Sequence, residues 1–270
     1  MLRVGLVALT LAALLGSGCG GESAEDVLRE TASNLGEIRS GDLDAELRFA
    51  DKSGAASGFT LAGPFSLDTG PLVAGRLDYS RLGGTGNEAA TFVSTGEKAY
   101  VEVAGTAYEL PAAQTSALRA ASGGLASGGL EQLDLTEWIQ DPELEDGGEV
   151  GGADTDLVSG RLDVAAAVNT LVQLMSAFGD GSTEPVSAED AERLRAAVAS
   201  SRVSVWTGSD DRLLRKLELA IQFEPTSAPA RIRNLVGVDV RFRLAVSDPN
   251  SDVTIQAPAD ARPYSDLGSG

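Results

Sequence analysis

The chain has 270 residues and a formal net charge of −19, with no histidine and a single cysteine. So acidic a protein is unsuited to nucleic acid, whose phosphates need Lys and Arg, or to electrostatic docking on anionic lipid. The missing histidine removes the commonest general base and metal ligand, and the lone cysteine leaves no Cys/His zinc site. The length suffices for one large domain or two small ones.

The first eighteen residues have the pattern of a secretory signal. Arg3 is the only charge among them, an apolar run follows from Val4 to Leu15, and small residues lie at 16–18. The run is shorter than the about 20 apolar residues that a membrane-spanning helix needs. We therefore predict a signal peptide over residues 1–18 rather than a permanent transmembrane anchor.

Cys19 follows the small residues directly. The sequence Leu15-Gly16-Ser17-Gly18-Cys19 resembles the lipobox of bacterial lipoproteins, although Gly16 stands where an aliphatic residue is usual. The resemblance implies that Cys19 carries acyl chains such as palmitate and becomes the mature N-terminus. Two or three such chains would anchor the protein stably, and residues 19–26 would be the lipidated cysteine and a polar tether. The alternative is a free thiol after an ordinary signal-peptidase site.

The next hundred residues predict one helix and then an antiparallel meander. Apolar residues recur at helical spacing over 24–38. From Asp42 the period changes to two, in five segments up to Val103 that place apolar side chains on one face. Thr95 to Lys98 has the composition of a hairpin turn.

The middle of the chain is mixed. We predict a helix with its centre over Ala112–Ala121 and a short amphipathic turn over Leu133–Ile139. The stretch Glu143–Asp156 is acidic and rich in glycine, which is typical of a solvated loop. Leu157–Leu162 predicts a short strand, after which Asp163 caps a helix over Val164–Phe178.

The last third begins with a helix over Ala188–Ala199, opened by Ser187. Three or four strands follow, with Val253, Ile255 and Ala257 closing the domain before Pro258. Strands at both ends of the chain with helices between them predict an α+β fold. We expect one strongly twisted, unclosed antiparallel sheet whose concave apolar face lies under the helices, forming a single domain over 27–264 with a tail over 265–270.

No motif predicts catalysis, a metal or a cofactor. Asp248–Asp252 has the first ligand positions of a calcium loop, but Val253 replaces the required glycine, so a turn is the better interpretation. There is no G-x-S-x-G, and no pair of carboxylates is marked out for glycoside hydrolysis. We therefore predict that the protein is not an enzyme, with an acid-pair hydrolase as a minor alternative.

Four stretches carry a resemblance to a known family. They are Gly96–Leu110, Asp156–Asp163, the segment from Val205 to Leu219, and Val246–Pro258. On these the chain resembles the actinobacterial LppX/LprA/LprF/LprG lipoproteins, which are related in fold to the lipoprotein carrier LolA. The resemblance implies a half-barrel with helices packed in its mouth, enclosing a cavity for the acyl chains of lipids or glycolipids.

These observations together suggest a lipoprotein of the cell envelope, exported and anchored on the outer side of the membrane through Cys19. It would carry or present a lipid or glycolipid, with a membrane transporter as a further partner and helices 164–178 and 188–199 as a lid. The alternative is a sensor or scaffold that uses the same fold to bind protein. The expected cavity residues are the large apolar side chains Phe59, Leu61, Phe65, Tyr79, Tyr100, Trp138, Met175, Leu219, Phe223 and Phe242.

Overall fold

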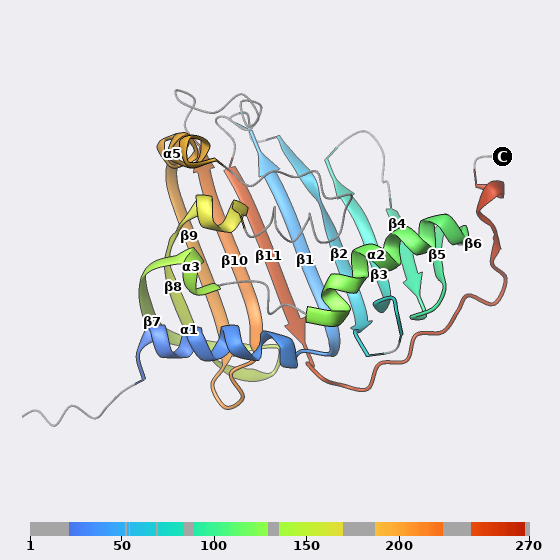
Figure 1. The fold of residues 1–270 in the computed structure, drawn as a ribbon, viewed down its shortest axis with the longest axis horizontal. Helices are drawn as coiled ribbons and strands as arrows, with labels where there is room; N and C mark the ends of the chain where they lie inside the picture. Colours follow the sequence, from blue (N-terminus) through green and yellow to red (C-terminus); the bar gives the residue numbers. More distant parts are fainter. Residues whose placement is uncertain are drawn as a thin grey trace, which may run out of the picture.

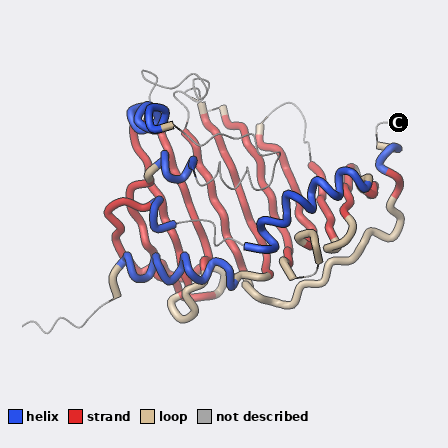
Figure 2. The backbone as a smooth tube through the Cα atoms, in the orientation of Figure 1, coloured by secondary structure: helices blue, strands red, loops and turns tan. Residues whose placement is uncertain are grey.

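The computed structural model describes residues 22–51, 53, 55–68, 70–83, 89–128, 135–169, 187–223 and 239–267, with the backbone alone over 121–128. Twelve strands form one open sheet in the order β12-β6-β5-β4-β3-β2-β1-β11-β10-β9-β8-β7. The described helices lie on one side of this sheet (Figure 1, Figure 2). The predicted architecture is confirmed: an unclosed half-barrel with helices on its concave face.

The first five strands form the predicted meander, β6 extends it by one strand, and all neighbours in this series pair antiparallel. These strands are β1 (Ser40–Ala50), β2 (Ala56–Ser66), β3 (Ala74–Leu82), β4 (Ala89–Ser94), β5 (Ala99–Val103) and β6 (Thr106–Glu109). The others are β7 (Ile139–Val150), β8 (Ala153–Leu162), β9 (Val198–Gly208), β10 (Leu214–Phe223), β11 (Asp239–Ser247) and β12 (Arg262–Pro263). The first and last thirds of the chain meet where β1 pairs with β11.

The helices that the structure describes from end to end are α1 (Ala24–Ser33), η1 (Asn34–Glu37), α2 (Ala112–Gly128), α3 (Leu135–Trp138), α5 (Ala188–Ala197) and η4 (Tyr264–Asp266). Residues 164–169 are also helical, and the Oδ1 atom of Asp163 accepts hydrogen bonds from the amides of Ala165 and Ala166. The predicted cap is therefore confirmed, while residues 170–178 of that predicted helix lie outside the described residues. Ser187 caps α5 as expected, accepting from the amide of Asp190.

The acidic stretch 143–156 is not a loop, and the prediction was wrong. It lies within a hairpin of β7 and β8, which pair antiparallel from Ile139 and Leu162 to Val150 and Ala153. β7 is the last strand of the sheet, so most of its side chains are exposed and show no apolar alternation. Exposed carboxylates and two register shifts also protect such an edge from pairing with another chain. Gly151 and Gly152, both with positive φ, make the turn.

α1 forms because its sequence is capped and one-sided. The Ser23 side chain accepts from the amide of Asp26, and two acidic residues lie in the first turn, where they suit the helix dipole. Its buried side chains include Val27 and Leu28. The helix crosses the ends of the strands at the bottom of Figure 1 and packs on α3 and β7–β9.

The chain after β11 forms an arm rather than a further regular strand. Asp248 and Asn250 have positive φ, and residues 251–261 contain no strand. The arm runs past the lower ends of the meander strands to the far edge of the sheet (Figure 1). There β12 pairs with β6 in the only parallel ladder among the described strands. Val253 and Ile255 are half-buried along this path.

Candidate functional site: the concave face of the sheet

The two halves of the concave face are covered differently. Over β7–β10, apolar side chains are buried beneath α1, α3, the 164–169 helix and α5. Val158, Val203 and Val205 are fully buried there, each with 0% exposure. This is the main core of the protein. β10, at the border of this half, nevertheless keeps half-buried apolar side chains, among them Leu219 and Phe223.

The concave face of β11 and β1–β4 remains partly exposed. The strand register places Leu219 opposite Phe242, Phe242 opposite Leu47, and Leu47 opposite Phe59. Four large apolar side chains thus cross four neighbouring strands in one line, and all four are half-buried. Leu61 and Tyr79 form a second facing pair one step along the strands. Six side chains meet on this surface. Five of them were predicted as cavity residues, and the sixth, Leu47, was not.

Three aromatic rings continue this surface across β2, β3 and β4. The ring centroids of Phe59 and Tyr79 are 6.0 Å apart with an interplanar angle of 30°, and those of Tyr79 and Phe92 are 6.2 Å apart at 71°. These are favourable stacked and edge-to-face arrangements. We call Phe59, Tyr79 and Phe92 the aromatic row. Phe92 is 45% exposed, although it is large and apolar.

Sequence reasoning missed two members of this surface, Leu47 and Phe92. Leu47 alternates with polar residues in a segment recognised as a strand, so its signal was present in the period of two. Phe92 is followed directly by the apolar Val93, so alternation did not show which of the two joins the concave face. Their position beside Phe59 and Tyr79 depends on the pairing of β1 and β4 with their neighbours. The size of a residue and its position in the sequence do not reveal which strands pair, so they could not place these two side chains.

Of the other predicted cavity residues, Phe223 is half-buried on the same side of β10 as Leu219 and, like Leu219 and Phe242, packs beside the main core. Trp138 and Phe65 are buried members of that core. Tyr100 faces the convex side, because its register partner Val93 also belongs to that side together with Arg76. It is 5% exposed, so it is a buried residue of the opposite face. Met175 lies outside the described residues.

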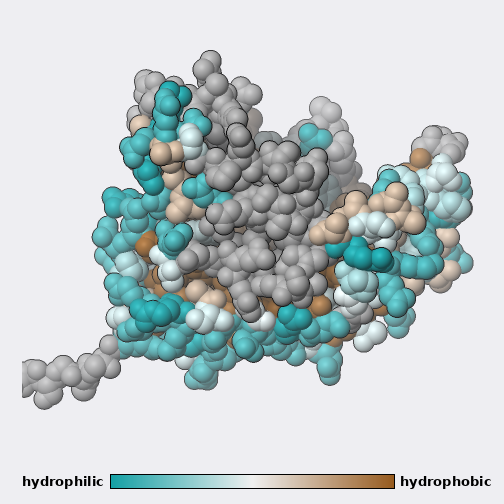
Figure 3. Space-filling model, viewed as in Figure 1, coloured by the Kyte–Doolittle hydropathy of each residue, from teal (hydrophilic) through white to brown (hydrophobic). Residues whose placement is uncertain are grey.

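In Figure 3 apolar residues show around the centre of the concave face, between α1 and the lower end of α2, and polar residues form most of the rim. The first half of α2 covers little of the sheet. From Ala112 to Ala120 all residues except Thr115 are exposed, and Leu118 is 43% exposed. The first half of α2, up to Ala120, is therefore not packed into the core of the sheet.

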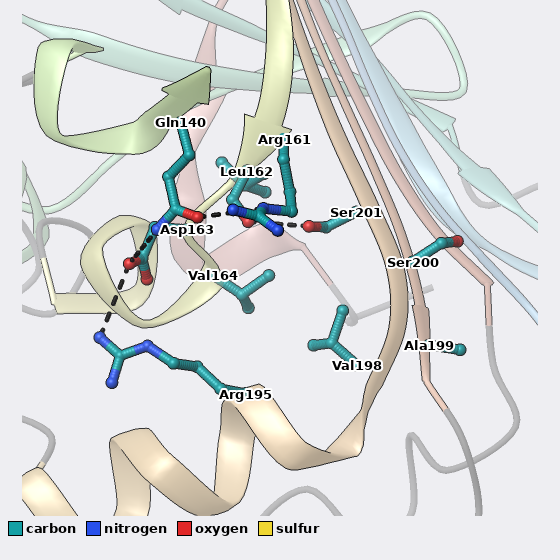
Figure 4. A pocket seen from close by; sticks show the side chains of 10 residues that line it. All are labelled: Gln140, Arg161, Leu162, Asp163, Val164, Arg195, Val198, Ala199, Ser200 and Ser201. Atoms are coloured by element: carbon teal, nitrogen blue, oxygen red, sulfur yellow. Dashed lines mark hydrogen bonds and ion pairs between the residues drawn. The ribbon is translucent and has the colours of Figure 1, made fainter. Parts of the chain in front are cut away.

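A polar hollow of about 420 Å³ lies beside α5 (Figure 4). Its apolar wall includes Val164 and Val198, and its polar wall includes Arg161 and Arg195. Arg161 donates to Gln140 at 3.0 Å, and Arg195 pairs with Asp163 at 3.6 Å. Both guanidiniums are therefore already neutralised or hydrogen-bonded. The hollow lies at the edge of the concave face, and its mixed lining does not make it a second apolar surface.

Arg212, which is 17% exposed in its side chain, holds the first described residues in place. It pairs with Glu22, Glu30 and Asp156, so it joins the first described residues and α1 to β8. Burial alone would lower its pKa, but the hydrogen bond to Asp156 and the three negative charges raise the pKa of Arg212 above its ordinary value. Thr31 adds a buried hydrogen bond of 2.9 Å to Thr207.

Taken together, the geometry defines a non-closing sheet with a partly exposed apolar concave face and helices over it. This is the fold of LprF from Mycobacterium bovis, which matches with a TM-score of 0.54 at 13% identity, over 89% of this chain and all of that one. A LolA superfamily protein from Nitrosomonas europaea also matches, with a TM-score of 0.25 at 10% identity over 89% and 96% of the two chains. The sequence matches no family model and no curated protein.

The match to LprF confirms the fold that the resemblance implied. No helix within the described ranges combines the length and apolar character needed to span a bilayer.

Proposed function

We propose that the protein binds the acyl chains of a lipid or glycolipid on its concave face, and carries or presents them in the cell envelope without catalysing a reaction. The observation that supports this most is the line of Leu219, Phe242, Leu47 and Phe59. These side chains are large, apolar and adjacent, and yet they are only half-buried. A surface of this kind in a monomeric protein usually has a partner.

Acyl chains suit this surface for physical reasons. Each methylene group removed from water contributes roughly 0.8 kcal/mol, so a chain lying along several strands gains affinity without polar contacts. The concave side of the central strands carries mainly aliphatic and aromatic side chains, with Arg81 beside Phe59 at one end. A broad apolar surface with few polar groups is typical of a site that recognises the shape and length of its ligand.

The N-terminal segment would bring this surface to a membrane. In the proposal residues 1–18 are removed, Cys19 is acylated, and the chain up to Gly21 links the lipid to α1. The proposed tether is shorter than residues 19–26, because the Glu22 side chain already pairs with Arg212 and Ala24 is 8% exposed in the core. The predicted lid of helices 164–178 and 188–199 is not part of the proposal, because residues 164–169 and α5 pack over β7–β10, and residues 198–199 belong to β9.

Lipid extraction tests the binding proposal. Residues 20–270 are expressed without the signal and Cys19, purified, extracted with organic solvent and examined by lipid mass spectrometry. The proposal predicts a lipid in stoichiometric amount, and its mass would identify the ligand class. Lipid-free protein that also takes up no fluorescent fatty acid would refute the proposal and favour a protein-binding scaffold of the same fold.

Acylation is tested separately. The full chain is expressed in a bacterium supplied with a labelled fatty acid, beside a Cys19→Ser variant. We expect label and membrane association in the first and neither in the second. A mature mass without acyl chains would show that the segment is an ordinary secretory signal, and would leave the concave face as the remaining part of the proposal.

A further inference from the structure

The convex face carries positive charge where the rest of the chain is strongly acidic. Arg48 of β1 lies directly opposite Arg241 of β11, and Arg241 lies opposite Ala220 of β10. Ala220 in turn lies opposite Arg202 of β9. The three arginines are exposed and share one line across four strands, so we call Arg48, Arg241 and Arg202 the arginine row.

This arrangement is unfavourable in the isolated protein. Neighbouring strands are about 4.8 Å apart, and like charges directly opposite one another destabilise a sheet. Within the part of the chain that the structure describes, Arg48 and Arg241 make no ion pair or side-chain hydrogen bond. Arg202 donates a hydrogen bond to the hydroxyl oxygen of Ser159 at 2.8 Å. It has no carboxylate partner among the described residues.

Glu46, Glu218 and Asp239 line the same hollows as the row, but none of them forms an ion pair with it within the described residues. Glu218 pairs with Lys216 at 2.6 Å, and Asp44 pairs with Arg243 at 3.3 Å. Glu46 is diagonal to Arg241 across the strand pair, but forms no ion pair with it within the described residues. The arginine row therefore keeps its positive charge in a chain whose net charge is −19.

The surface around the row is also hollowed. Arg48 and Arg241 line a hollow of about 330 Å³, while Arg241 and Arg202 line another of about 200 Å³. Both hollows include Ala220, whose methyl group leaves the space open. On the other side of Arg48 lies Gly58, where a Cβ atom would come within 1.9 Å of the Leu47 carbonyl oxygen. Small residues thus leave the guanidinium groups accessible on both sides.

From this geometry we infer that the arginine row is a docking surface for an acidic segment of a partner protein. Guanidinium groups bind carboxylates through paired hydrogen bonds, and a narrow acidic segment can place its carboxylates along the row. A flat anionic bilayer would instead meet the flanking Asp44, Glu46 and Glu218 together with the arginines. The row is on the opposite side of the sheet from the proposed acyl-chain surface, so both could be occupied at once.

Poly-L-glutamate is a suitable probe. The full chain carrying Cys19→Ser, which lacks the proposed acylation site, is compared with the same chain carrying Arg48→Gln and Arg241→Gln. We expect the double variant to bind about tenfold more weakly at low salt, since removing charges at a docking surface lowers association, and binding of both should fall as salt rises.

A matched control carries Arg29→Gln and Arg193→Gln, the same charge change at exposed sites on α1 and α5. It should bind within about twofold of the parent chain. Equal loss in both double variants, or no binding by the parent, would overturn the inference. Row-dependent binding to phosphatidylglycerol vesicles in place of poly-L-glutamate would overturn the choice of a protein partner. Thermal unfolding separates these outcomes from misfolding, because losing the facing arginines should not lower Tm.

Discussion

The two halves of the concave face are covered to different extents. Apart from the edge strand β7, both consist largely of strands in which apolar residues alternate with polar ones. Over β7–β10 the apolar side chains are sealed by α1, α3 and the 164–169 helix, whereas over β11 and β1–β4 they stay half-buried. Alternation therefore indicates which side of a strand faces inward. It does not tell whether that side is filled by the protein or left for a ligand.

The largest expected effect comes from breaking the sealed half. Trp138 is 2% exposed and lies in the main core, so Trp138→Ala should lower the free energy of unfolding by about 3–5 kcal/mol. Urea denaturation followed by circular dichroism measures this. A loss below about 1 kcal/mol would show that the α3 region is not part of the core.

Arg212 tests how α1 is attached to the same half. Arg212→Gln leaves Glu22, Glu30 and Asp156 close together without their cation, and should cost about 1–3 kcal/mol of unfolding free energy. Arg161→Gln is the control, because that side chain is 63% exposed and its change should cost less than about 1 kcal/mol. If the two variants are equally stable, α1 is held by apolar packing and the Thr31–Thr207 hydrogen bond rather than by Arg212.

In the partly exposed half, a substitution should change ligand uptake more than stability, the reverse of what we expect for the sealed half. Phe92 is 45% exposed, so Phe92→Ala should cost less than about 1 kcal/mol in stability and still reduce the uptake of a fluorescent fatty acid severalfold. Denaturation and uptake are measured on the same preparation. A large stability loss with unchanged uptake would mean that Phe92 is core, and that the two halves do not differ.

The smallest effect concerns the turn between β9 and β10. Burial opposes ionisation of Asp211, but hydrogen bonds from the amide of Leu213 and from Arg215 lower the pKa of Asp211 below its usual range. A lowered pKa gives stability that is complete above about pH 4 and is lost as the pH falls through the folded-state pKa. The Tm difference between wild type and Asp211→Asn should therefore shrink in acid. A difference independent of pH would contradict this.

Much of the fold could be predicted because the period of the sequence changes clearly. α1, the meander, the Asp163 and Ser187 caps and the placement of helices on one face were all predicted correctly. β7 was missed because an exposed edge strand has no buried face to impose alternation. Tyr100 was misassigned because Ala99-Tyr100-Val101 is apolar in succession, so only its pairing with Val93 determines which face it joins.

The candidate site was predictable only in part. Phe59, Leu61, Tyr79, Leu219 and Phe242 were named from their size and alternation, and the register brings them together. The opposition of Arg48 and Arg241 could not be foreseen, since it arises from a pairing between strands far apart in the chain. Local pattern identifies faces, while long-range register decides which residues share them.

The most direct measurement compares two adjacent residues of β3. Tyr79 points to the concave face and Ser80 to the convex face, so Tyr79→Asp and Ser80→Asp place the same charge on opposite sides of one strand. The amount of lipid bound per protein is measured for both, after circular dichroism has shown that both fold. We predict about tenfold less lipid on Tyr79→Asp and nearly wild-type loading on Ser80→Asp, because a buried carboxylate opposes an acyl chain. Equal loading of the two variants would contradict the assignment of the concave face as the lipid site.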